Sequence, residues 1–196
     1  MSQLASLLST ANQALSDKDY KRAHKSCIQV LQTYGPNAEA YFLLGVLTAE
    51  HDNHAKAVEL FDRALVLHDA EARLHAHRAR ALLAINQRDA SRLAAVRAAQ
   101  LGPKDALTRD TIGVVFTRLG DHDAAVALFE DAVTSNPDHA EYQYNLASSR
   151  QFAGNFDGAK QAYRRAIALD PGLYKAWSAL ISLEKQTVEN EQIDTL

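Results

Sequence analysis

Apolar and small residues fall at helical spacing along this chain, in stripes that are interrupted at regular intervals. Residues 38–51 carry one such stripe, formed by Tyr41, Leu44, Gly45 and Thr48. A short polar break follows, and residues 54–67 carry a second stripe, formed by Ala57, Phe61 and Ala64. Apolar positions three and four apart mark one face of a helix. The pattern therefore predicts two helices joined by a tight turn.

The same two-helix pattern returns at a constant interval, which is set by the equal spacing of Pro103, Pro137 and Pro171. It divides the chain into windows 4–37, 38–71, 72–105, 106–139 and 140–173. One equivalent position of each window, the small slot, always holds a small residue: Ala11, Gly45, Ala79, Gly113 and Ala147. Another equivalent position, the ring slot, holds Cys27, Phe61, Ala95, Phe129 and Tyr163. Small residues let two helices approach closely, and a ring then fills the space that a packed interior would not leave empty.

These slots and their interval resemble the signature of the tetratricopeptide repeat, a helix–turn–helix unit. The resemblance covers residues 4–185 and implies an all-α, right-handed solenoid of five repeats. Ile181 stands where the earlier windows have Gly or Ala, so residues 174–185 are expected to form a C-terminal capping helix rather than a sixth hairpin. Residues 186–196 are then a polar tail or linker.

Composition narrows the possible classes of function. The net charge is −3 and the pI is about 6.2, which gives no general attraction to nucleic acid or anionic membrane. No apolar run is long enough to span a bilayer, and the first residues lack the pattern of a secretion signal. Cys27 is the single cysteine, which fits a reducing compartment. We expect a cytoplasmic protein that binds neither nucleic acid nor membrane.

Candidate catalytic chemistry is sparse. The chain has eight histidines, but His54 and His122 occupy a slot that elsewhere holds Tyr20 and Phe156, so packing explains them. The sequence contains no phosphate-binding loop, nucleophile elbow or cysteine–histidine arrangement. The prediction is a chain with no catalytic residues, no cofactor and no metal site.

Charge alternates between windows. Residues 38–71 contain seven acids and two bases, whereas residues 72–105 contain seven bases and two acids. Neutralisation between neighbouring hairpins is the simpler interpretation. The alternative is a ligand site, because in this family the first helices line a concave groove. The expected groove residues are Phe42, Leu43, Val46, Arg73, His77, Arg80, Asp110, Thr111, Tyr144 and Asn145.

Within this groove, Arg73, His77 and Arg80 are expected to anchor an acidic or carboxylate group of a peptide or partner protein, because guanidinium groups bind carboxylates bidentately. The family's clamp for chaperone C-termini is not matched. Asn145 and Lys175 fit it, but Asp110, Val114 and Ala179 stand at its other positions. Self-association through Leu4, Leu7 and Leu8 is a further possibility.

The leading interpretation is a non-catalytic protein–protein interaction scaffold. An alternative comes from the C-terminal segment, where Lys185, Gln186, Thr187, Glu189 and Asn190 resemble the junction of bacterial proteins that join a tetratricopeptide array to a sulfotransferase. That resemblance implies a regulatory or substrate-presenting domain of a larger sulfotransferase. A polar segment after a capping helix explains the same residues.

Overall fold

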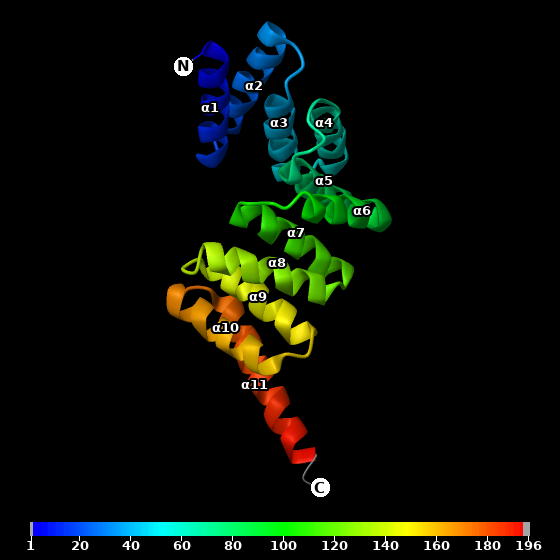
Figure 1. Ribbon diagram of the computed structural model, residues 1–196. Coiled ribbons are helices and arrows are strands. Elements are labelled where there is room, and N and C mark those ends of the chain that lie inside the picture. Colours follow the sequence, from blue (N-terminus) through cyan, green and yellow to red (C-terminus); the bar gives the residue numbers. More distant parts are fainter. Residues whose placement is uncertain (1, 194–196) are drawn as a thin grey trace. The chain divides into compact units, whose positions relative to one another are not determined.

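The computed structural model describes the backbone of residues 2–193 and the side chains of residues 2–185. Within that range the chain is all-helical and has no strand. The eleven helices of this range (Figure 1) are α1 (Gln3–Ser16), α2 (Tyr20–Tyr34), α3 (Ala38–Glu50), α4 (His54–Leu67), α5 (Ala72–Ala84), α6 (Arg88–Gln100), α7 (Ala106–Leu119), α8 (His122–Ser135), α9 (Ala140–Phe152), α10 (Phe156–Leu169) and α11 (Tyr174–Ile193). The expected all-α fold class, with five helical hairpins and a further helix, is confirmed.

The hairpins form two compact units, unit 1 within Met1–Pro103 and unit 2 within Lys104–Leu196. In both units each first helix packs against the second helix of its own hairpin, and that second helix packs against the next first helix. Successive first helices also touch, α1 with α3 and α3 with α5 in unit 1, and α7 with α9 in unit 2. No hairpin buries its apolar side alone, which is why the same slots recur.

The turn inside each hairpin has one backbone geometry. A residue with positive φ recurs once in every hairpin, namely Lys18 (59°), Asp52 (59°), Asn86 (60°), Gly120 (85°) and Gly154 (83°). Glycine adopts this left-handed geometry most readily, and Asn and Asp tolerate it, which explains the residues at four of the five turns. The next residue caps the second helix. In three repeats its side chain accepts a bond from a backbone N–H of the first helical turn, at Asp19, Asn53 and Asn155.

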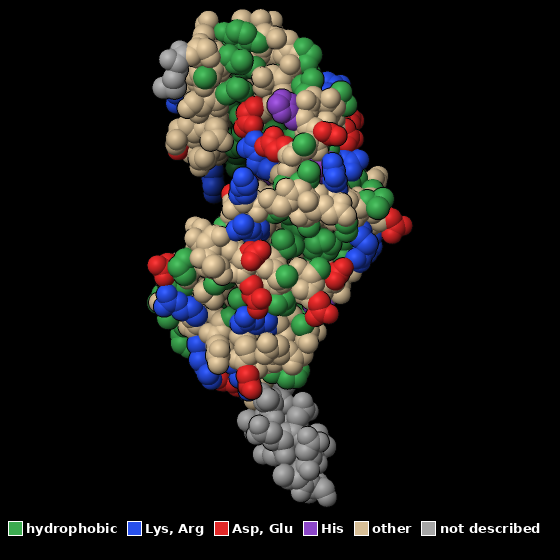
Figure 2. All heavy atoms as spheres, in the orientation of Figure 1, with side chains coloured by type: hydrophobic (Ala, Val, Ile, Leu, Met, Phe, Trp, Pro, Cys, Tyr) green, Lys and Arg blue, Asp and Glu red, His purple; other side chains and the backbone are tan. Residues whose placement is uncertain are grey.

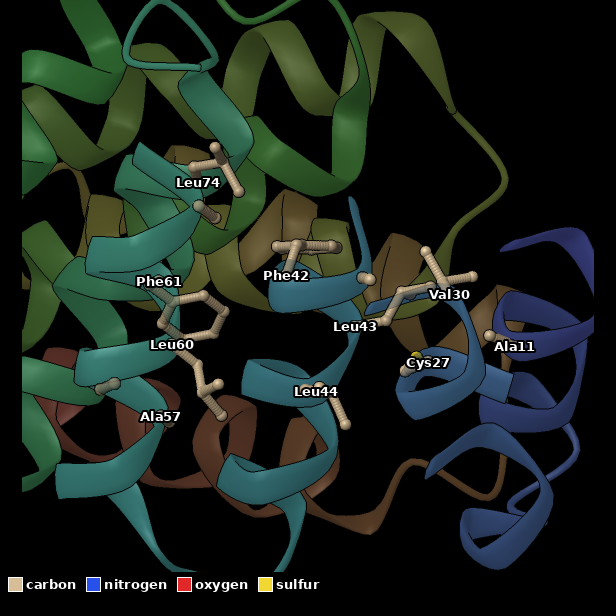
Figure 3. Packing of buried hydrophobic residues seen from close by; sticks show 13 residues of the cluster. Ala11, Cys27, Val30, Phe42, Leu43, Leu44, Ala57, Leu60, Phe61 and Leu74 are labelled. Atoms are coloured by element: carbon tan, nitrogen blue, oxygen red, sulfur yellow. The ribbon is translucent and has the colours of Figure 1, made fainter. Parts of the chain in front are cut away.

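Small and aromatic slots face each other in the core. A Cβ atom on Gly45 would lie 2.6 Å from Phe61 Cε1, and one on Gly113 would lie 2.7 Å from Phe129 Cε1. Figure 3 shows the Phe61 ring of α4 directed toward α3. Real Cβ atoms are not found this close to a ring, so these hairpins close fully only with glycine at the facing position. The predicted role of the small slot is confirmed at both sites.

The third hairpin replaces this pairing with other contacts. Ala95 stands in the ring slot and is fully buried. The Ser91 hydroxyl donates to the Ala79 carbonyl oxygen at 2.8 Å, so a polar group in the core has a partner. Arg78 of α5 stands where the repeat normally has leucine, and it pairs with Asp62 of α4. The hairpin is therefore joined to its neighbour partly by charge.

The first and last helices of the described chain both pack apolar side chains inward. Leu4, Leu7 and Leu8 are partly buried and pack against the core of unit 1. In α11, Ala176, Leu180 and Leu183 are buried, whereas Ile181 is 51% exposed.

The backbone of α11 continues as a helix to Ile193, past residue 185, and residues 194–196 lie outside the described structure. The domain limits expected from the sequence stay a prediction. Over the described residues, no helix combines the length and the hydrophobicity of a membrane span.

Candidate functional site

The expected basic strip of unit 1 is centred on Arg73, at the start of α5. Its guanidinium group donates to Glu39, 2.6 Å from Nη2 to Oε2, and to Glu71, 2.9 Å from Nε to Oε1. It also lies over the Phe42 ring, 4.1 Å from the ring centre. Burial lowers the pKa of Arg73, but the bonds to Glu39 and then Glu71 outweigh it, so the net shift is upward. Arg73 is charged and is already held by two carboxylates.

Three of the residues expected to contact a partner are core residues. Phe42, Leu43 and Thr111 are 5%, 2% and 5% exposed. Phe42 packs edge-on against His77, with ring centres 5.0 Å apart, and Leu43 belongs to the core of unit 1. In Figure 3 Leu43 points toward Val30 of α2. These three side chains offer almost no surface, and the expectation that they line a groove is corrected on that ground.

The remaining expected residues keep part of their surface. In unit 1 these are Val46, Arg73, His77 and Arg80, which are half-buried. In unit 2 they are Asp110, Tyr144 and Asn145, also half-buried. Val46 lines a pocket with residues of α1, α2 and α3 in unit 1, and Tyr144 and Asn145 line a pocket between helices of unit 2.

This pocket in unit 2 has a volume of about 270 Å³. It lies on the surface formed by the first helices of the hairpins, here called the first-helix surface. Its lining residues come from four helices: Val114, Thr117 and Arg118 of α7, Phe129 of α8, Tyr144, Asn145 and Ser148 of α9, and Lys175 of α11. Aromatic rings form part of the wall, and amide, hydroxyl and cationic groups form the rest. A pocket with a few polar groups among apolar ones is typical of a binding site.

Two polar pairs fix the side chains around this pocket. Lys175 Nζ lies 2.5 Å from Glu141 Oε2 and 4.3 Å from the centre of the Tyr144 ring. The Asn145 amide donates to Asp110, 2.8 Å from Nδ2 to Oδ1. Burial raises the pKa of the Asp110 carboxyl, and the bond from Asn145 opposes that shift. Ring, ammonium and amide groups are therefore held in place before any ligand binds.

Sequence reasoning missed Thr117, Arg118 and Phe129 as pocket residues. Arg118 lies in the last turn of α7, beyond the middle turns from which the groove residues were chosen. Phe129 was assigned only to the core slot, and its ring also forms part of the pocket wall. Following the first helix one turn further would have found Arg118. The double role of Phe129 depends on packing that the sequence does not contain.

Charges on the surface are mixed rather than separated by sign. Figure 2 shows Lys and Arg side chains beside Asp and Glu side chains over much of the visible face. Cross-hairpin pairs such as Arg150–Glu130 and Arg165–Asp138, both 2.8 Å, explain part of this arrangement. Pairing between hairpins thus accounts for several of the alternating charges in the sequence.

The histidines take part in packing and local bonds. His122 stacks on Phe152 with ring centres 4.8 Å apart, and His139 stacks on Tyr142 at 3.9 Å. Histidine ring nitrogens also lie near backbone oxygens, 2.8 Å for His75 and Asp69. Over the part of the chain that the structure describes, no three side chains of His, Cys, Asp or Glu are grouped as metal ligands.

Helical hairpins that repeat at a constant interval, with small and aromatic slots in contact, define a helical-repeat protein. A tetratricopeptide repeat family model matches residues 8–73, 111–173 and 144–186. The chain therefore belongs to the tetratricopeptide repeat family, as the sequence pattern predicted. A comparison with curated protein sequences finds no match.

Solved structures share this fold. A structure of PilF from Pseudomonas aeruginosa has a TM-score of 0.77 at 16% identity, covering 98% of this chain and 87% of its own. YrrB, described as a tetratricopeptide protein with an unusual peptide-binding site, has a TM-score of 0.64 at 22% identity, covering 88% and 89%. MamA has a TM-score of 0.62 at 20% identity, covering 88% and 94%. At these identities the likeness shows the fold.

Proposed function

We propose that this chain is a non-catalytic interaction module that binds an extended segment of a partner protein on the first-helix surface of unit 2. The observation that carries the proposal is the pocket of about 270 Å³ between α7, α9 and α11, which combines an aromatic wall with fixed polar groups. Peptide recognition uses this combination, because apolar side chains need pockets and the peptide backbone needs hydrogen-bond partners. The peptide-binding site named for YrrB supports the same use of the fold.

The pocket chemistry favours a segment with a carboxylate beside an apolar side chain. Arg118 and Lys175 supply positive charge, and Asn145 and Ser148 supply bonding groups. A ligand carboxylate would share Lys175 with Glu141, and an apolar side chain would pack on the Tyr144 ring. Arg73 in unit 1 is a weaker anchor for such a group, because it pairs with two carboxylates, Glu39 and Glu71, whereas Lys175 pairs with Glu141 alone.

Other expectations stay predictions. The cytoplasmic location is one of them, and self-association is another. The proposed link to a sulfotransferase rests on residues whose side chains, apart from Lys185, lie outside the described part of the structure. No observation on the described residues favours that alternative.

The proposal is tested by placing a photo-crosslinking amino acid at Ser148, inside the pocket, and irradiating a lysate of the source cells. The matched control carries the same group at Ala127, an exposed position on the second helix α8. We expect a discrete protein adduct from position 148 and none of that mass from position 127. Tyr144→Ala should then weaken binding of the captured partner about tenfold, or ~1.4 kcal/mol.

Two results would contradict the proposal. One is the absence of an adduct from position 148. The other is an adduct of equal yield from both positions, because it would show contact unrelated to the pocket.

A further inference from the structure

A second surface, on helix α2 of the first hairpin, also has the properties of a binding site. Helix α2 carries Lys21, Arg22 and Lys25 within its first two turns, and it contains no acidic residue. All three side chains are exposed, as is His24 between them. We call this face, made of Lys21, Arg22, His24, Lys25, Ile28, Gln29 and Gln32, the α2 basic surface.

These cations lack the partners that other second helices provide. Among the described residues, no carboxylate lies within 4.0 Å of Lys21, Arg22 or Lys25. The two nearby acids are used locally, since Asp19 accepts from the Arg22 backbone N–H and Asp17 accepts from Gln13. In α4, by contrast, Lys56 pairs with Glu59. The α2 basic surface therefore keeps a net positive charge.

The position of these cations, at the start of α2, does not stabilise the helix. The N-terminal end of a helix carries a partial positive charge, so cations there are unfavourable. Lys21 and Arg22 lie in the first turn of α2, and the cap residue Asp19 offsets only part of that charge. Folding does not explain this cluster of bases, whereas recognition of a negatively charged ligand does.

Beside the cations is a shallow, open hollow of about 610 Å³, lined by residues of α2 alone, namely His24, Lys25, Ile28, Gln29 and Gln32. Ile28 is partly buried and packs against the core of unit 1, so the hollow has a fixed apolar residue. The amides of Gln29 and Gln32 can each donate to and accept from a peptide backbone. The hollow thus offers an apolar contact, two amides and a cationic edge.

From this arrangement we propose that the α2 basic surface binds an acidic segment of a partner protein. An aliphatic or aromatic side chain of the segment packs on Ile28, and carboxylates on either side of it meet Lys21 and Lys25. Charge complementarity selects the acidic segment. The apolar residue in the hollow favours a protein side chain over a phosphate backbone, and none of the hollow's lining residues is an aromatic on which bases would stack.

The test is selection from a phage-displayed library of random peptides on the intact chain. Parallel selections use Lys21→Glu/Lys25→Glu and a control, Lys56→Glu/Arg63→Glu, which makes the same charge change on α4. We expect peptides recovered on the wild type and on the control, but not on the α2 variant, to carry Asp or Glu on both sides of one apolar residue. A synthetic peptide of that sequence should bind the α2 variant at least tenfold more weakly, and Ile28→Ser several-fold more weakly.

Three results would overturn the proposal. The first is a library that yields no acidic peptides, and the second is acidic peptides that bind the α2 variant as well as the wild type. The third is binding of a single-stranded oligonucleotide or of phosphatidylserine vesicles, lost in the α2 variant, with no acidic peptide recovered. That last result would assign the surface to a polyanion or a membrane.

Discussion

At the scale of single residues, the small slot of the first helix sets how closely each hairpin closes. Gly45 and Gly113 each face a phenyl ring with no space for a methyl group. The repeat period correctly predicted that both glycines lie at a close contact between helices, because such a contact requires a small residue in every repeat. The period could not show that Phe42 and Leu43 are buried. First helices pack on two sides, and four consecutive residues of α3, 42 to 45, are buried, so helical spacing alone does not separate groove from core.

Gly113→Ala tests the fit of this slot. Alanine stabilises a helix by roughly 0.5–1 kcal/mol relative to glycine, whereas forcing a methyl group into a packed core costs about 1–3 kcal/mol. The Cβ atom would be 2.7 Å from Phe129, so we expect the second effect to dominate and the free energy of unfolding to fall. Urea denaturation followed by circular dichroism measures it.

Phe129→Leu provides the control for that prediction. It removes the ring atoms that the methyl group would meet, so in this background Gly113→Ala should cost less than in the wild type. Equal costs in the two backgrounds would show that the clash is not with the ring.

At the scale of elements, the turn and the cap of every hairpin repeat with the same period as the core. The cap position is the residue that follows the left-handed one in each turn. Asn53 and Asn155 cap α4 and α10 there with nearly identical backbone angles, φ −87° and −86°. Gln87 has the same geometry, φ −86° and ψ 68°, but its longer side chain makes no capping bond. The sequence predicted the turns, and Gln87 is the one residue at this position that is neither Asp nor Asn.

Gln87→Asn should therefore stabilise the third hairpin. Asparagine at this position accepts a bond from the first turn of the helix, a contribution of about 0.5–1 kcal/mol. A rise in the thermal midpoint measures the effect. Gln87→Ala is the matched control and should change the midpoint little, because the native side chain makes no cap bond. An asparagine variant no more stable than the alanine variant would contradict the assignment.

Polar pairs between neighbouring hairpins could be predicted from the sequence only in part. Glu39 pairs with Arg73 and Glu141 pairs with Lys175, in each case between equivalent first helices of successive repeats. Alternating charge predicted some neutralisation between hairpins. It could not identify Arg73 as held by two carboxylates, because Glu71 and Arg73 are close neighbours whose contact depends on side-chain direction. The distinction matters, since it moves the proposed anion site away from Arg73.

At the scale of the whole molecule, stability is built from contacts between neighbouring hairpins inside each compact unit. The sequence predicted the all-α class and the number of hairpins, because both follow from the period. It gave no sign that the units divide at Pro103, since Pro103 occupies the same slot as Pro137 and Pro171. In repeat proteins each repeat is stabilised chiefly by its neighbours, so damage to one end need not reach the other.

Leu183→Ala tests whether the units respond separately. Leu183 of α11 is buried, and removing such a side chain costs about 2–5 kcal/mol. Two native probes lie in different units. Trp177, the single tryptophan, belongs to unit 2, where its indole N–H donates to the Pro171 carbonyl oxygen at 3.2 Å. Cys27 is buried in unit 1, and burial raises its pKa to about 11, so near pH 8 the thiol reacts only when unit 1 opens.

We expect Leu183→Ala to lower the urea midpoint of Trp177 fluorescence and to leave the rate of Cys27 labelling near its wild-type value. The damaged contact lies between α10 and α11, and local opening of a repeat array follows the nearest contacts. Ser182→Ala, at an exposed position on the same helix, is the control and should move neither probe. If the Leu183 variant instead accelerates Cys27 labelling in step with the loss of Trp177 signal, the two units unfold as one cooperative body, and separate responses of the units are ruled out.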